Sequence, residues 1–164
     1  MEPLTDEQVI AAFGDPLPFM LNDGTVSPGW EQRILAFAAL PAPLVLAWDR
    51  SRTVSAFRCH HRLVPHFEGL MLALFNDPEV WATINDFGGC YAWRMQRRAR
   101  TPSRHSWAIA LDMDVAENPF GRAPKTHPRF EDIVEAHGFA WGGNFKGARK
   151  DGMHVEFADI GRLT

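Results

Sequence analysis

The spacing of apolar residues predicts the secondary structure of most of the chain. Between residues 63 and 75, apolar positions recur every three or four residues, as on the buried face of a helix. That face holds Leu63, Phe67, Leu70, Met71 and Leu74. Short apolar or alternating runs predict strands at residues 34–40, 44–48, 53–57, 107–112 and 153–157.

Capping and stop signals predict further helices over residues 5–14, 78–87 and 128–136. Thr5 and Gln8 form a capping box for the first of these, and Gly138 ends the last. Helices and strands follow one another without regular alternation. This order indicates an α+β fold with a small antiparallel sheet and flanking helices.

Composition is that of one compact domain. The chain has 164 residues, of which 46% are hydrophobic, enough to bury a core without disulfide or metal staples. Cys59 and Cys90 are expected to be free buried thiols. Residues 34–48 are almost wholly apolar, but the run is shorter than a membrane span and is broken by Pro41 and Pro43. It therefore predicts a pair of buried strands and no membrane anchor.

Charge argues against a nucleic-acid partner. The 17 basic and 20 acidic residues give a formal net charge of -3, and one tyrosine offers little for base stacking. The first seven residues are acidic and lack the basic and apolar regions of a signal peptide. We therefore expect synthesis in the cytoplasm without a signal peptide.

His105, Asp112 and His154 form a candidate metal site. Two imidazoles and one carboxylate are the ligands of a catalytic zinc ion whose fourth position stays open for water. Asp151, three residues before the last ligand, suits a general base. The ligand set predicts a Zn²⁺-dependent hydrolase.

The ligands must also be able to meet. His105 and Asp112 are an odd number of steps apart, so within one strand they would point to opposite faces. His105 therefore needs a turn, which Pro102 just upstream allows. Alternation over residues 153–157 places His154 and Glu156 on the same side of the last strand.

The motifs Ser-x-His-x6-Asp, Trp-Gly-Gly-x-Phe and Asp-x-Met-His-x-Glu-Phe, found in this order, resemble the zinc peptidoglycan peptidases. That family comprises D-alanyl-D-alanine carboxypeptidases and dipeptidases and the L-alanyl-D-glutamate endopeptidases of bacteriophage endolysins. The resemblance covers roughly residues 88–158. It implies that His105, Asp112 and His154 bind Zn²⁺, that Asp151 is the catalytic base, and that Arg94 helps to polarise the scissile carbonyl. Ala108 stands where the family usually has glycine.

The resemblance also implies a Hedgehog/DD-peptidase-like fold and peptidoglycan stem peptides as the substrate. An endolysin-like L-alanyl-D-glutamate endopeptidase is favoured, because the short, signal-free chain and its Cys-Tyr-x-x-Arg and Asp-x-Met-His-x-Glu-Phe segments look more like phage lysins. A D-alanyl-D-alanine carboxypeptidase, or a zinc-containing recognition domain without hydrolysis, is the alternative. We expect residues 1–164 to be one zinc peptidase domain without a separate wall-binding domain. It should be a monomer that acts at the bacterial cell wall.

Several polar residues have two interpretations. Arg94 belongs to a basic run that in most proteins is a solvated loop; its other members are Arg97, Arg98, Arg100 and Arg104. Glu156 either orients a ligand or is an exposed strand glutamate. His60 and His61 favour the polar start of a helix over a second metal site, because no further ligand spacing accompanies them. His127 is an outside candidate for the active-site cleft.

Overall fold

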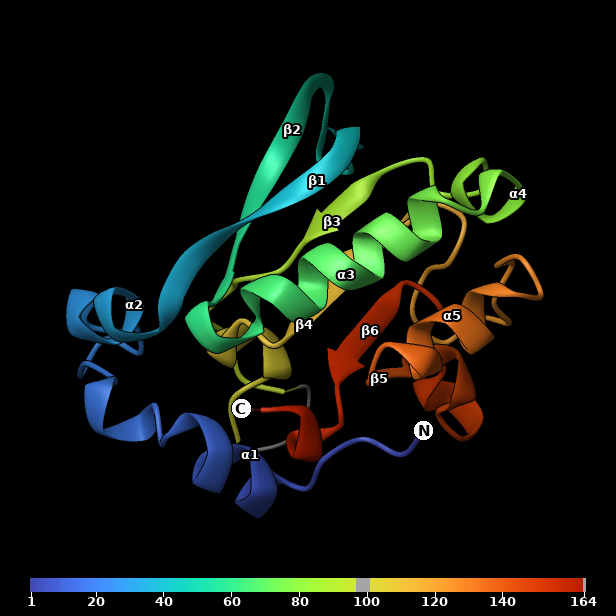
Figure 1. Ribbon diagram of the computed structural model, residues 1–164. Helices are drawn as coiled ribbons and strands as arrows, with labels where there is room; N and C mark the ends of the chain where they lie inside the picture. The colour runs from blue at the N-terminus through green and yellow to red at the C-terminus, as the bar shows by residue number, and fades with distance from the viewer. Residues whose placement is uncertain (97–100, 164) are drawn as a thin grey trace.

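A six-stranded sheet forms the centre of the computed structural model, which describes residues 1–96 and 101–163 (Figure 1). The strand order is β2-β1-β3-β4-β6-β5, and every neighbouring pair is antiparallel except β1 and β3. The strands are β1 (Leu35–Leu46), β2 (Asp49–His60), β3 (Phe87–Gly89), β4 (Ala110–Met113), β5 (Phe139–Trp141) and β6 (His154–Phe157). The predicted α+β class is confirmed.

Five α-helices and several short 3₁₀ turns flank this sheet within the described residues. The helices are α1 (Asp6–Phe13), α2 (Pro28–Ile34), α3 (Val64–Phe75), α4 (Pro78–Trp81) and α5 (Phe130–Ala136). The 3₁₀ turns are Leu17–Phe19, His61–Leu63, Arg104–Trp107, Gly142–Asn144, Gly147–Arg149 and Ile160–Arg162. The capping box of Thr5 and Gln8 begins α1 as predicted, and Gly138 follows α5 with a positive φ of 82°.

Helix α3 covers one face of the sheet and supplies much of the core (Figure 1). All five residues of its predicted apolar face are fully buried. The Phe67 ring contacts Phe57 of β2 and Phe139 of β5, with ring centroids 5.6 and 5.0 Å apart. Because burying one such side chain contributes about 1.5–3 kcal/mol, this face anchors α3 across strands that are distant in sequence.

Residues 34–48 do not form a pair of strands, so that prediction was wrong. Residue 34 ends α2, and residues 35–46 form the single strand β1, which pairs with β2. The register of this pairing shifts between Ala39 and Leu44, on either side of Pro41 and Pro43. Since proline has no N–H to donate, the irregularity lets the strand continue through both prolines.

The helix predicted over residues 78–87 is also shorter than expected, because α4 ends at Trp81. Polar side chains tie the following segment to the loop after β4: Asn85 Nδ2 donates to Asp114 Oδ1 at 2.8 Å, and Asp86 Oδ1 accepts from the Val115 N–H at 2.9 Å. These long-range bonds draw the chain into β3. Cys59 and Cys90 are free and buried, as predicted.

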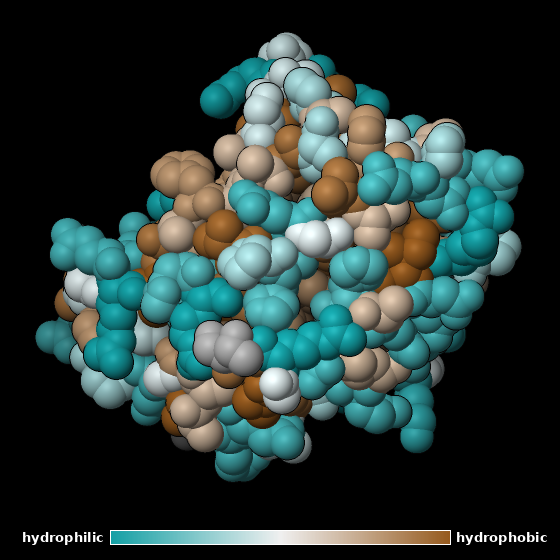
Figure 2. Space-filling model, viewed as in Figure 1, coloured by the Kyte–Doolittle hydropathy of each residue, from teal (hydrophilic) through white to brown (hydrophobic). Residues whose placement is uncertain are grey.

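Polar residues dominate the face drawn in Figure 2, where apolar residues lie scattered among them. The β1–β2 hairpin carries two strongly exposed aromatic side chains, Phe37 at 70% and Trp48 at 65%. Among the residues that the structure describes, none of the helices is long and apolar enough to cross a membrane.

Candidate metal centre

A tight turn brings His105 back over the sheet. Residues Arg104–Trp107 form a 3₁₀ helix, and Ala108 after it adopts a left-handed conformation with φ 54° and ψ 37°. Strand β4 starts only at Ala110, three residues later than predicted. The predicted turn at His105 is therefore present, and it removes the conflict of an odd spacing to Asp112.

The left-handed residue explains why glycine is usual at the position of Ala108. Alanine is destabilised by roughly 1–2 kcal/mol in this conformation, and glycine avoids that strain. Replacing alanine with glycine also costs roughly 0.5–1 kcal/mol in chain entropy and about 0.8 kcal/mol for the lost buried methyl group, so the two effects nearly cancel. We expect Ala108→Gly to change the free energy of unfolding by less than about 1 kcal/mol. Ala110→Gly, at an equally buried strand position, should destabilise by about 1–2 kcal/mol. Urea denaturation of both variants measures the difference.

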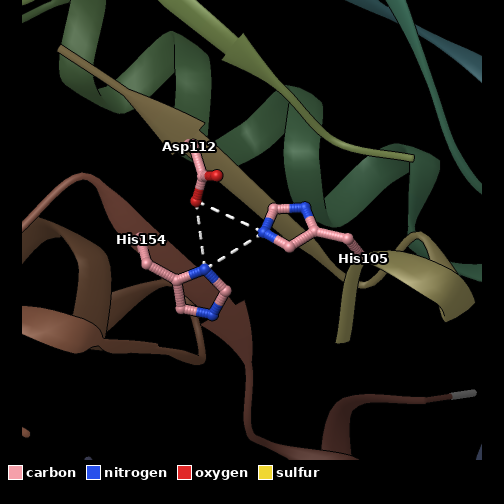
Figure 3. A group of neighbouring side chains, drawn as sticks. All are labelled: His105, Asp112 and His154. Atoms are coloured by element: carbon pink, nitrogen blue, oxygen red, sulfur yellow. Dashed lines mark hydrogen bonds and ion pairs between the residues drawn. The ribbon is translucent and has the colours of Figure 1, made fainter. Parts of the chain in front are cut away.

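Strand pairing places the other two ligands side by side. Asp112 of β4 lies directly opposite His154 of β6 in the antiparallel register. Both side chains project from the face of the sheet away from α3, which lies behind the strands in Figure 3. The alternate residue Phe157 faces α3 instead, with its ring centroid 5.1 Å from that of His66.

The three ligand atoms form a triangle that fits a zinc ion (Figure 3). His105 Nε2 lies 3.2 Å from His154 Nδ1 and 3.3 Å from Asp112 Oδ1, and the third side of the triangle is 3.0 Å. Ligands held tetrahedrally at 2.0–2.1 Å from zinc are about 3.3 Å apart. The donor set therefore matches zinc in both chemistry and spacing.

Hydrogen bonds behind the imidazoles fix which nitrogen faces the metal. His105 Nδ1 lies 2.7 Å from the Cys90 carbonyl, an acceptor only, so Nδ1 carries the proton and Nε2 is free to bind. His154 Nε2 lies 2.9 Å from Glu156 Oε2, which leaves Nδ1 for the metal. Such outer partners orient ligands and increase their basicity. Glu156 is 5% exposed, so of its two interpretations the orienting one is correct.

The site is electrostatically coupled without its metal. Burial alone would lower the pKa of His154, but hydrogen bonds to Asp112 and Glu156 raise it to about 10. Burial would raise the pKa of Asp112, yet its hydrogen bonds with His105 and His154 hold that pKa well below the usual range. A carboxylate that stays ionised to low pH is a suitable ligand for a divalent cation.

Residues 97–157 match the D-alanyl-D-alanine carboxypeptidase family. The match covers 61 of the 164 residues, so this part of the chain is similar to that peptidase family. The matched segment contains all three ligands and Asp151, while residues 1–96 lie outside it. No curated protein and no solved structure gave a significant match. This match and the ligand triangle together support a zinc metallopeptidase that acts on peptidoglycan, with His105, Asp112 and His154 as its metal-binding triad.

Asp151, the predicted general base, lies close to the three ligands, whose charges act on its carboxyl group. Its Oδ1 is buried and has no hydrogen-bond partner, and burial raises the pKa of the carboxyl to about 6 despite the nearby His154. An unpartnered buried oxygen is costly unless a ligand or water uses it. Asp151 is held by its backbone, whose N–H donates to the Gly142 carbonyl at 2.9 Å.

Both glycines of the Trp-Gly-Gly motif are required by close packing around Asp151. A Cβ on Gly142 would lie 2.5 Å from the Asp151 carbonyl oxygen, and a Cβ on Gly143 would lie 2.3 Å from the Trp141 ring. The indole N–H of Trp141 donates to the Gly152 carbonyl at 2.9 Å. The motif thus fixes the turn that presents Asp151.

Arg94 lies at the rim of the metal centre. Its Nη2 is 3.8 Å from Asp112 Oδ2, and its side chain is 54% exposed. Its backbone is fixed by Ser106, whose Oγ donates to the Arg94 carbonyl at 2.8 Å and accepts from the Arg94 N–H at 3.1 Å. The backbone of Arg94 is therefore anchored, while its half-exposed guanidinium lies beside Asp112.

The other members of the basic run differ from Arg94. Arg97, Arg98 and Arg100 lie outside the described residues. For Arg104 the expectation of a solvated loop was wrong, because its side chain is only 11% exposed and is bonded on several sides. The one feature of the sequence that could have indicated the burial of Arg104 is its position next to the ligand His105.

The remaining histidine candidates are separate from the metal triad. His60 caps the 3₁₀ turn at His61–Leu63, where its Nδ1 accepts from the Arg62 N–H, so the predicted polar helix start is confirmed. His127 lies 3.7 Å from Glu79 and accepts from the Arg129 N–H. Among the described residues, His105, Asp112 and His154 are the group whose atoms could hold one ion.

Proposed function

We propose that the protein is an endolysin-like L-alanyl-D-glutamate endopeptidase that cleaves peptidoglycan stem peptides. The observation that carries hydrolysis is the buried, unpartnered Oδ1 of Asp151 near the ligand triangle. The choice of bond rests on the likeness of the Cys90–Arg94 and Asp151–Phe157 segments to phage lysins. A D-alanyl-D-alanine carboxypeptidase is the second candidate, because that is the description of the matched family.

In this mechanism zinc, when bound, supplies a Lewis acid that lowers the pKa of water toward about 7 and polarises the scissile carbonyl. Asp151 accepts a proton from the attacking water as the new C–O bond forms. The same carboxyl then gives that proton to the amine nitrogen as the C–N bond breaks. With a pKa of about 6, Asp151 is ionised at pH 7 and basic enough to take part in both transfers.

Defined stem peptides distinguish the two candidate activities. Purified zinc-loaded protein is incubated with a muropeptide of known sequence, and the fragments are identified by mass spectrometry. Release of L-alanine-terminated glycan peptide supports the endopeptidase, whereas loss of a single terminal D-alanine supports the carboxypeptidase. If the zinc-loaded protein cleaves neither bond, the result would support a zinc-containing recognition domain without hydrolysis.

Arg94 is proposed to donate to the carbonyl oxygen of the scissile bond. Removing a buried donor of this kind costs about 10²–10³-fold in turnover, and we expect Arg94→Ala to lower kcat by about 10- to 100-fold because the side chain is half exposed. Zinc content should be unchanged. Arg94→Lys keeps the charge without the planar fork and should retain more activity. An unchanged kcat in Arg94→Ala would show that Arg94 is a solvated loop residue without a role in catalysis.

We further propose that residues 1–164 work as one catalytic domain, as a monomer, at the bacterial cell wall. The support is the continuous sheet, in which β1 and β2 from the first part of the chain extend the strands that carry the zinc ligands. The first 96 residues also contribute the Cys90 carbonyl that orients His105.

A further inference from the structure

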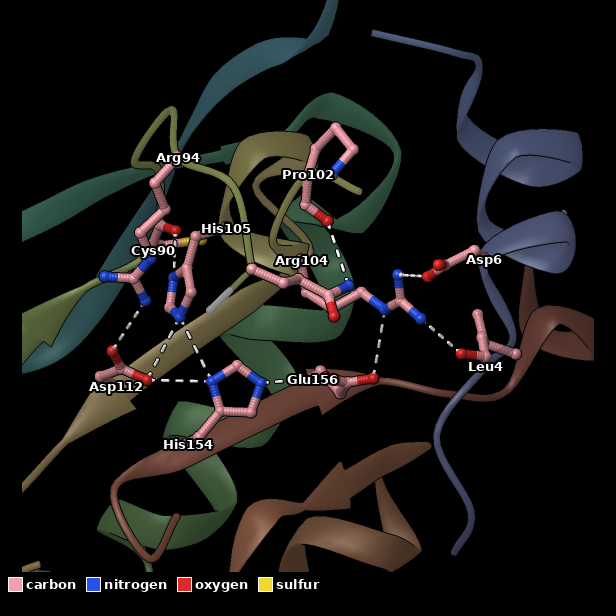
Figure 4. Close-up of polar contacts among 11 residues, drawn as sticks. Leu4, Asp6, Cys90, Arg94, Pro102, Arg104, His105, Asp112, His154 and Glu156 are labelled. Atoms are coloured by element: carbon pink, nitrogen blue, oxygen red, sulfur yellow. Dashed lines mark hydrogen bonds and ion pairs between the residues drawn. The ribbon is translucent and has the colours of Figure 1, made fainter. Parts of the chain in front are cut away.

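Arg104 is a largely buried arginine that contacts three acceptors, two in the N-terminal segment and one in β6 (Figure 4). Its Nη1 donates to Asp6 Oδ1 at 2.7 Å, its Nη2 donates to the Leu4 carbonyl at 2.6 Å, and its Nε lies 3.4 Å from Glu156 Oε1. A guanidinium presents its donors in a rigid fork, so these contacts fix its position. Removing it would leave Glu156, itself 5% exposed, as a buried carboxylate that keeps its contact with His154 but loses its arginine.

Glu156 connects this guanidinium to the zinc site. One oxygen, Oε1, faces Arg104, while the other, Oε2, accepts from His154 Nε2 at 2.9 Å. Because a carboxylate is planar and rigid, holding one oxygen restricts the other. The orientation of the His154 ring therefore depends on the position of Arg104.

The same contacts form a closed ring of four residues that includes two of the ligands. Arg104 and His105 are consecutive residues of one 3₁₀ turn, and His154 and Glu156 lie on one face of β6. The turn thus supplies one zinc ligand, His105, directly and steadies a second, His154, through Glu156 (Figure 4). We propose that Arg104 is a positioning residue, which holds Glu156 so that His154 Nδ1 faces the zinc ion and joins this arrangement to the N-terminal segment.

Zinc affinity tests this role without relying on hydrolysis. Loss of a residue that directly orients a ligand typically weakens metal binding about 10- to 100-fold. Glu156→Gln should fall in that range, and Arg104→Gln, one contact further away, should weaken zinc binding about three- to tenfold. Dissociation constants are measured by competition with a chromogenic chelator. The visible spectrum of the Co²⁺-substituted protein should shift in both variants, because it reports ligand geometry.

Asp6→Asn is the matched control for a purely structural effect. It removes an anion from Arg104 but keeps the Glu156 contact, so it should lower the thermal stability while leaving the zinc dissociation constant within twofold. In the double variant, Arg104→Gln should add nothing to Glu156→Gln, because both act through one contact. If Arg104→Gln does not fold, Arg104→Lys takes its place in every comparison.

Two results would overturn the proposal. The first is an Arg104 variant whose stability falls while its zinc affinity and Co²⁺ spectrum match those of the wild type. The second is additive losses of zinc affinity in the double variant, which would mean that Arg104 and Glu156 act independently.

Discussion

Replacing Asp151 with asparagine should lower hydrolysis of stem peptides by about 10²–10⁴-fold, the range expected for loss of a general base. The amide is close in size to the carboxylate but cannot accept the proton of the attacking water. Turnover is measured by quantifying fragments under saturating substrate, and bound zinc by elemental analysis. The zinc content should stay at one ion per chain, because Asp151 is outside the ligand triangle.

The folding stability of Asp151→Asn shows whether its loss of activity comes from the missing base or from misfolding. Burial raises the pKa of Asp151, so its ionised form costs folding free energy as the pH rises from the ordinary value of 3.8 through about 6. Asp151→Asn removes that cost and should have a Tm no lower than that of the wild type at pH 7. Near wild-type turnover in a folded, zinc-loaded variant would show that the base lies elsewhere.

Replacing His154 with alanine should abolish both zinc binding and activity. The substitution removes one of three ligands and leaves Asp112 and Glu156 without the imidazole that lies between them. Metal binding and folding are coupled, so adding zinc should stabilise the wild type and have no effect on the variant. Thermal melts with and without zinc, together with elemental analysis, measure both effects.

His127→Ala provides the matched control, since His127 is a histidine near a carboxylate but is not one of the three ligands. It should bind zinc and hydrolyse stem peptides as the wild type does. Stoichiometric zinc in purified His154→Ala protein would contradict the assignment of the ligands. Retention of zinc by the wild type in strong acid would contradict it too, because the imidazoles must be neutral to bind.

Local patterns in the sequence predicted the parts of the fold that depend on neighbouring residues. The spacing from Leu63 to Leu74 predicted α3, and alternation placed His154 and Glu156 on one face of β6. The need for a turn at His105 followed from counting residues along a strand. In each case the deciding contacts lie within one element, so a few adjacent residues carry the information.

Features that depend on distant residues were missed. Arg104 stands in a run of arginines and looks solvated, but its partners Leu4 and Asp6 lie about one hundred residues earlier in the sequence. The continuity of β1 through Pro41 and Pro43 is set by its register with β2. A local sequence pattern does not show which distant strand or acceptor packs against a given residue. The burial of Arg104 and the length of β1 were therefore wrongly predicted.

The raised pKa of His154 has a consequence for how the protein acquires its metal. In the zinc-free protein at neutral pH, the imidazolium carries a positive charge between the carboxylates of Asp112 and Glu156. The proton on His154 then supplies the positive charge that the metal would otherwise provide, and it reduces the repulsion between Asp112 and Glu156. Loading is an exchange of one cation for another, so the apparent zinc affinity should rise about tenfold for each unit by which the pH increases, up to about pH 10.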